Sequence, residues 1–291
     1  ELEAGTTGPA VADGWWPLAF DPAIDGTTTG QGDLRAFVFD RSTSFDPLLD
    51  TYIAVQQGDI DQAAWEYALP AGLYHVTVAV GDPTEFGSLQ WINAEGTPLL
   101  PGFVPDGDLP FAFADGTIEV TDGALTIDAE GGIDTRLSHI SIVEVQPDQP
   151  QFTDVVAGGR EILNLALDVD PNAPFGIGVT IEQPEDAIFE FTVTTDTVRL
   201  YRTLDGIPIE GSVNTSGGRD SISFTPFDPL EPGTPYTLVV DGVTTEGREP
   251  FVPLMRTFVT GTADGDQPVQ DPAVDFFKAD VAAVGPLTSL T

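Results

Sequence analysis

The stretch from Ala64 to Gly96 constrains the fold of this chain more than any other, because it alternates like strands of an antiparallel sheet. A turn at Pro70–Gly72 separates WEYAL from LYHVTVAV, and a polar loop, GDPTEFGS, precedes LQWINAEG. Neighbouring side chains of a strand point to opposite faces. One face of the second run therefore carries Tyr74, Val76, Val78 and Val80. We expect two or three strands of a β-sandwich here, with an irregular loop typical of binding modules.

The rest of the chain extends this all-β prediction to two domains. The 31 glycines and 25 prolines are spread through the 291 residues, which favours many short strands joined by turns. A chain of this length suits two domains and a tail. We expect a first domain over residues 1–147, a second over residues 152–262, and a linker or C-terminal tail over residues 263–291.

The charge of the chain limits its partners. The formal net charge is -37, with ten basic residues of which only Lys278 is a lysine. The acids are dispersed among turns, as on the surfaces of halophilic proteins, where salt screens their repulsion. We therefore expect an extracellular or cell-surface protein in a salty setting; the alternative is an ordinary acidic secreted protein. Nucleic acid is not an expected partner, because no basic stripe is present. No apolar run reaches the roughly 20 residues of a membrane span.

The order of several segments in the first domain resembles malectin-like modules, jelly rolls of the galactose-binding-like superfamily. The segments are LLDTYIAVQQ, WEYALPAGLYHVTVAVGDPTEF, WINAEG and GALTIDAEGGIDTRLSHISIVEV. The resemblance implies a jelly-roll β-sandwich that binds carbohydrate. It places ligand contacts at Glu85 and Phe86 in the GDPTEF loop and at Asp134 before the last strand. Malectin has two adjacent aromatic residues in that loop, whereas this chain has Phe86 alone.

Residue chemistry adds further candidates for a sugar-binding site. In the GDPTEFGS loop, the carboxylates of Asp82 and Glu85 can accept hydrogen bonds from hydroxyls, and Phe86 can cover an apolar ring face. The alternative is a turn in which Asp82 bonds its own backbone. Trp15 and Trp16 either form an exposed stacking platform or pack into the core.

The other two tryptophans of the chain are weaker candidates for ligand contact. Trp65 shares a strand face with Tyr67, and we expect both in the core. The alternation around Trp91 leaves its direction open.

The first residues, ELEAGT, resemble the Glu-x-Glu start of some calcium-containing carbohydrate-binding modules. This resemblance implies a structural Ca²⁺ held by Glu1 and Glu3, which would share one strand face. The aspartate pairs elsewhere lack the spacing of a calcium-binding loop, so we interpret them as solvated turns. They lie in PDGD, DVDPN and DGDQ.

The second domain resembles bacterial Ig-like domains. The resemblance rests on RLYRTLDG, the NTSGG turn, SISFTP, LEPGTPYTL and RTFVTG, and it implies an Ig-like β-sandwich that acts as a spacer. The final residues, VGPLTSLT, resemble the entry to a β-propeller of the sugar-dehydrogenase type. That resemblance implies a longer protein.

The sequence does not favour catalysis. The two histidines, His75 and His139, fall within strands, and no nucleophile elbow accompanies them. We therefore expect a non-catalytic carbohydrate-binding or adhesion module that recognises a cell-surface polysaccharide. One alternative is a structural protein of a surface layer, filament or matrix, whose partners are other copies of itself. Another is the accessory N-terminal part of a propeller-type sugar oxidoreductase.

Overall fold

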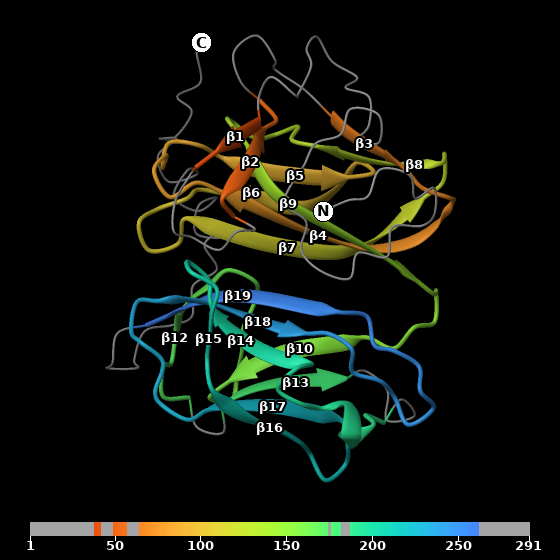
Figure 1. The fold of residues 1–291 in the computed structure, drawn as a ribbon, viewed down its shortest axis with the longest axis vertical. Helices are drawn as coiled ribbons and strands as arrows, with labels where there is room; N and C mark the ends of the chain where they lie inside the picture. The colour runs from red at the N-terminus through yellow and green to blue at the C-terminus, as the bar shows by residue number, and fades with distance from the viewer. Residues whose placement is uncertain (1–37, 42–48, 57–63, 174–175, 182–186, 262–291) are drawn as a thin grey trace, which may run out of the picture.

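The computed structural model describes residues 38–41, 49–56, 64–173, 176–181 and 187–261. These residues form two β-sandwiches, which lie one above the other in Figure 1. A short 3-10 helix, η3 (Glu190–Thr192), belongs to the second sandwich. The predicted fold class is confirmed: the chain is all-β, with a jelly roll followed by an Ig-like sandwich.

The first sandwich has the strand order of a jelly roll. Its strands are β1 (Val38–Asp40), β2 (Thr51–Ala54), β3 (Ala64–Ala68), β4 (Gly72–Gly81), β5 (Gln90–Ala94), β6 (Thr97–Phe103), β7 (Phe111–Val120), β8 (Ala124–Asp128) and β9 (Arg136–Val145). One sheet has the order β1-β2-β9-β4-β7, and the facing sheet has the order β3-β8-β5-β6. The chain crosses between the sheets at every step from β2 to β9 except the β5–β6 hairpin, which is the path of a jelly roll.

The predicted strands of the Ala64–Gly96 stretch are β3, β4 and β5. Trp65 and Tyr67 lie on one face of β3 with stacked rings, 5.7 Å apart, and pack on the core as expected. The alternating apolar residues of β4 also enter the core: they are Tyr74, Val76, Val78 and Val80. The opposite face of β4 is buried as well, which alternation alone did not predict, since His75 is only 5% exposed there.

The second sandwich follows the Ig-like order. Its strands are β10 (Phe152–Ala157), β11 (Arg160–Glu161), β12 (Ala166–Val169), β13 (Ile177–Ile181), β14 (Val198–Arg202), β15 (Ile207–Pro208), β16 (Gly211–Thr215), β17 (Ser221–Pro226), β18 (Pro235–Val240) and β19 (Leu254–Thr260). The sheets have the orders β11-β10-β13-β17-β16 and β12-β19-β18-β14-β15. Four strands of the first sheet, β10-β13-β17-β16, correspond to A-B-E-D, and β14, β18 and β19 to C, F and G.

A buried tyrosine at the start of β18 supports this assignment. The Tyr236 hydroxyl accepts a hydrogen bond of 2.9 Å from the backbone N–H of Glu231, five residues upstream. This is the geometry of the tyrosine corner of Ig-like sandwiches. The LEPGTPYTL segment, which contains both residues, is therefore the corner that leads into strand F.

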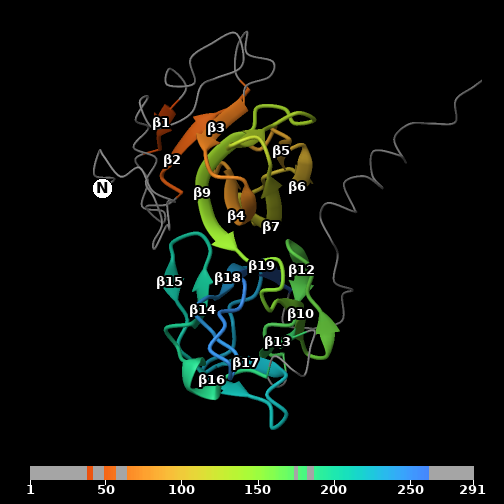
Figure 2. The ribbon, with the colours of Figure 1, turned by 90° about the vertical axis from the view of Figure 1, so that its right-hand side faces the viewer.

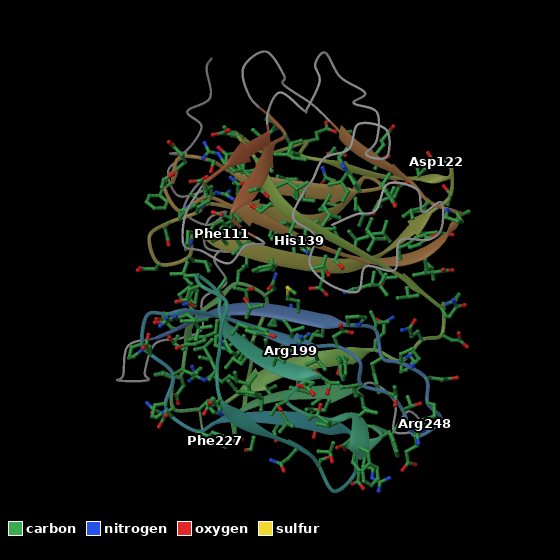
Figure 3. All side chains as sticks on the ribbon, in the orientation of Figure 1. Phe111, Asp122, His139, Arg199, Phe227 and Arg248 are labelled. Atoms are coloured by element: carbon green, nitrogen blue, oxygen red, sulfur yellow. The ribbon has the colours of Figure 1, made fainter. Side chains whose placement is uncertain are left out.

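The two sandwiches pack face to face, with β7 of the jelly roll against β19 (Figures 1 and 2). Side chains of both sandwiches meet between them (Figure 3). Phe111 and Phe113 from β7 form an apolar cluster there with Met255 and Leu204. The Asn164 side chain links the layers, donating to the carbonyl of Phe113 and accepting from the N–H of Thr257. The second sandwich therefore packs on the outer face of the β4–β7 sheet.

Candidate functional site

A buried ionic network lies where β4 ends and its loop begins. Asp82 is 2% exposed, and its carboxylate pairs with Arg41 at 3.1 Å and with Arg136, at the start of β9, at 2.9 Å. The other carboxylate oxygen of Asp82 accepts hydrogen bonds from the backbone N–H and the hydroxyl of Thr84. Three segments distant in the sequence are thus joined at one carboxylate.

Aromatic rings and backbone carbonyls complete the surroundings of the two arginines. The Arg41 guanidinium lies 4.3 Å from the centre of the Tyr52 ring, and that of Arg136 lies 5.3 Å from the same ring. Arg41 also donates a hydrogen bond of 2.6 Å to the carbonyl of Gly81 and another to the carbonyl of Leu49. These cation–π contacts and charge-assisted hydrogen bonds favour the paired, ionised state of the network.

The Asp82 carboxyl is held in its ionised form. Burial raises its pKa, but the hydrogen bonds from Thr84 and Arg136 and the charge of Arg41 outweigh burial and hold the pKa below its ordinary value. All of its strong acceptor positions have protein partners. Asp82 therefore anchors the β4–β5 loop, and the turn in which it bonds backbone two residues on is present.

The same network holds the β8–β9 loop beside the β4–β5 loop. Arg136 donates to the carboxylate of Asp134 at 2.9 Å while it pairs with Asp82. Leu89 and Ile133 form an antiparallel bridge with two backbone hydrogen bonds of 2.9 and 2.8 Å. The two loops therefore form one surface at this end of the jelly roll.

Several side chains on these two loops are exposed to solvent. Phe86 is 46% exposed, and Glu85 beside it is also exposed. Ile133 on the facing loop is 63% exposed. The Asp134 side chain is 37% exposed, and its backbone has φ of 53°, in the left-handed region that Asp and Asn tolerate better than most residues. The loop end thus presents apolar and carboxylate groups together.

Trp91 supports the β8–β9 loop from the outer face of β5. A Cβ atom added at Gly131 would lie 3.0 Å from the indole ring of Trp91. One added at Gly132 would lie 3.1 Å from the Trp91 Cβ. The indole N–H donates to the Asn93 side chain, which in turn donates to Asp128. Glycines at these positions let the loop lie flat on the indole, so Trp91, whose direction the alternation left open, is half-buried.

Four predicted site residues lie in a part of the chain that the structure does not describe. Trp15, Trp16, Glu1 and Glu3 lie outside the described residues, so the stacking platform and the calcium site stay predictions. Within the described ranges, no group of three or more His, Asp or Glu side chains could hold a metal ion. Nor does that part of the chain contain a helix long and apolar enough to cross a membrane.

Sequence reasoning missed the residues that organise the loops: Arg41, Tyr52 and Arg136. A signal for two of them was available, because a chain with ten basic residues among 291 places few arginines without a structural reason. Arg136 directly follows the IDT segment that carries Asp134, and Arg41 lies near the first strand. Their contact with Asp82 could not be predicted from the sequence, because Arg41 lies 41 positions before Asp82 and Arg136 lies 54 positions after it.

Comparisons with known proteins identify no family. No protein-family profile and no curated protein matches the sequence. A calcium-binding mutant of β-glucuronidase 2 from Bacteroides uniformis is similar in structure, with a TM-score of 0.30 and 14% identity. That match covers 38% of this chain, which spans only 14% of the glucuronidase.

Two carbohydrate-binding modules also match in structure. The module CBM35 from Cellvibrio japonicus Abf62 matches with a TM-score of 0.27 and 13% identity, over 42% of this chain and 88% of the module. Xyl-CBM35, in complex with a glucuronic acid containing disaccharide, has a TM-score of 0.27 and 12% identity, over 42% and 86%. Both matches are distant in sequence and in structure.

Proposed function

We propose that the jelly roll is a non-catalytic carbohydrate-binding module that uses the loop end formed by the β4–β5 and β8–β9 loops. The observation that supports this best is that one loop exposes Phe86 and Glu85, and that Arg136 joins this loop to the one that carries Asp134. The Phe86 ring takes the apolar face of a sugar, and the carboxylates accept hydrogen bonds from its hydroxyls.

Preorganisation favours binding at this end. The Asp82 network and the Leu89–Ile133 bridge hold both loops before a ligand arrives, so less conformational entropy is lost on binding. The second sandwich packs on the outer face of the β4–β7 sheet, so that face offers no broad surface to a polysaccharide chain. We further propose that the module acts outside the cell on a polysaccharide, with the Ig-like sandwich as its support.

The proposal predicts that Phe86→Ala weakens binding to a glycan selected on an array at high salt by about tenfold or more, as loss of a stacking ring removes about 1.5 kcal/mol. Asp134→Asn keeps the left-handed backbone and removes the charge, and we expect a loss of similar size. Isothermal titration calorimetry measures both.

The matched control is Phe227→Ala, because Phe227 is 67% exposed and lies at the far end of the second sandwich (Figure 3). It is expected to bind like the wild type. Binding that survives both loop variants unchanged contradicts the proposed site. An array without any hit, together with concentration-dependent assembly in solution, favours the structural, self-associating alternative.

A further inference from the structure

A cleft of about 130 Å³ lies between the two sandwiches, away from the loop end. The jelly roll contributes His75, Asp115 and Thr117 to its lining. The second sandwich and the segment before it contribute Gln151, Phe152 and Leu254. One wall is therefore polar and the other largely apolar, and neither sandwich forms the cleft alone.

His75 is the unusual group in this cleft. It is 5% exposed, yet neither ring nitrogen has a hydrogen-bond partner within the described residues. Its Nε2 lies 3.4 Å from a carboxylate oxygen of Asp115 without forming a hydrogen bond. Buried polar groups are nearly always paired, so an unpaired imidazole that lines a cleft points to a partner from outside the chain.

The protonation states of His75 and Asp115 determine which hydrogen-bonding groups a ligand must carry. Burial lowers the pKa of His75 to about 4, so at neutral pH the imidazole is uncharged, with one N–H donor and one acceptor nitrogen. Burial raises the pKa of Asp115 to about 6, against the opposing charge of Arg256, so this carboxyl is ionised at neutral pH. A hydroxyl group can accept a hydrogen bond from the N–H of His75 and can donate one to its other ring nitrogen or to the Asp115 carboxylate. An anion, by contrast, is repelled by Asp115.

The opposite wall favours a ring. Phe152 stacks on Phe251 with their ring centres 4.7 Å apart, and Leu254 extends the apolar surface. A cavity of about 150 Å³ holds a benzene molecule, so a cleft of about 130 Å³ takes in only part of a hydroxyl-bearing ring. Because the cleft is open to solvent, the rest of such a ring can extend from its mouth.

We propose that this interdomain cleft is a second ligand site, which takes one neutral, hydroxyl-bearing ring such as a monosaccharide unit. The ring lies on Phe152 and Leu254, and its hydroxyls bond to His75, Asp115 and Thr117. Because both sandwiches line it, the ligand also joins the two domains. This site does not depend on the loop end, so either can fail without the other.

The chain has only two histidines, which allows a direct test by imidazole NMR of the full chain. Glucose, galactose and mannose are titrated separately up to about 100 mM, a range that detects millimolar affinity. We expect the His75 signals to move in a saturable way with at least one sugar. His139 lies on β9 and does not line the cleft, so its signals are expected to stay in place.

Two matched variants locate the response. Gln151 is exposed at the cleft, so Gln151→Trp is expected to obstruct it and to weaken the His75 response at least about tenfold. Gln146→Trp changes an exposed glutamine of the same segment, between β9 and β10, that does not line the cleft, and it should respond like the wild type.

The loop-end variant Asp134→Asn separates the two proposals, since it should leave the His75 response unchanged. Three results overturn the inference: no saturable His75 shift with any of the sugars, equal shifts of both histidines, or a Gln151→Trp variant that responds normally. The first result means that only water fills the cleft.

Discussion

At the scale of single residues, two of the ten basic residues, Arg41 and Arg136, are paired inside the jelly roll. Both guanidinium groups form ion pairs with Asp82 and cation–π contacts with Tyr52, and both are largely shielded from solvent. A buried ion pair contributes little net stability over an apolar core, but removing one partner leaves an uncompensated charge. The network therefore ties the position of Asp134 to the end of β4.

The neighbouring residues His75 and Asp115 give a pH prediction at the same scale. For Asp115, the folded-state pKa of about 6 exceeds the ordinary value of 3.8, so the folded state gains protons first and stability rises as pH falls through this window. For His75, the pKa falls from 6.5 to about 4, so stability falls over nearly the same window. The two slopes have opposite signs and largely offset each other in the wild type.

Asp115→Asn removes the contribution of Asp115 to the pH dependence of the free energy of unfolding. Relative to the wild type, its free energy of unfolding should decline by up to about 3 kcal/mol between pH 7 and pH 4, because each pKa unit corresponds to about 1.4 kcal/mol. His75→Gln should show the opposite trend, a relative gain on acidification. Urea unfolding across this pH range measures both. Differences from the wild type that do not vary with pH would contradict the shifted pKa values of His75 and Asp115.

At the scale of elements, the end of β4 depends on one glycine. Gly81 has φ of 121°, and a Cβ added there would lie 2.2 Å from the carbonyl oxygen of Pro110. The close approach lets β4 pair with β7 up to Phe111, and the Gly81 carbonyl also accepts a hydrogen bond from Arg41. The backbone at this position therefore sets where the β4–β5 loop begins.

We predict that Gly81→Ala destabilises the protein by about 3 kcal/mol or more, because a Cβ both strains the backbone and collides with a carbonyl. Thermal unfolding followed by circular dichroism measures the loss. Gly87→Ala in the same loop is the control, since nothing lies within 4 Å of its added Cβ. Equal stability of the two variants would show that β4 can end differently.

At the scale of the whole molecule, the second sandwich is a docked support rather than a loosely tethered spacer. The interface combines the Phe111–Phe113–Met255–Leu204 cluster with the Asn164 hydrogen bonds. Interdomain contacts without such an apolar cluster usually permit relative motion. The cluster here favours one fixed arrangement of the two sandwiches.

Met255→Glu tests this arrangement, because it places a charge against Phe111 and Phe113. We expect a larger radius of gyration by small-angle X-ray scattering and loss of a single cooperative unfolding transition. Met255→Leu conserves volume and should behave like the wild type. An unchanged radius of gyration in Met255→Glu would mean that docking does not depend on this cluster.

The sequence by itself determined the local structure of this protein. Strand alternation in Ala64–Ala94 and the turn residues predicted the β-strands, since the two-residue period depends only on neighbours in the chain. The chemistry of the GDPTEF loop predicted Glu85 and Phe86 as ligand contacts, and the resemblance to malectin-like modules implied Asp134. Ligand contact at these three residues stays a prediction.

Only the tertiary structure decided which surfaces meet. Burial of the second face of β4, the convergence of Arg41 and Arg136 on Asp82, and the cleft at His75 all join residues far apart in the chain. A carboxylate in a loop looks the same in sequence whether it faces solvent or two buried arginines. Its partner is chosen by how the sheets and the two sandwiches pack, which no local pattern records.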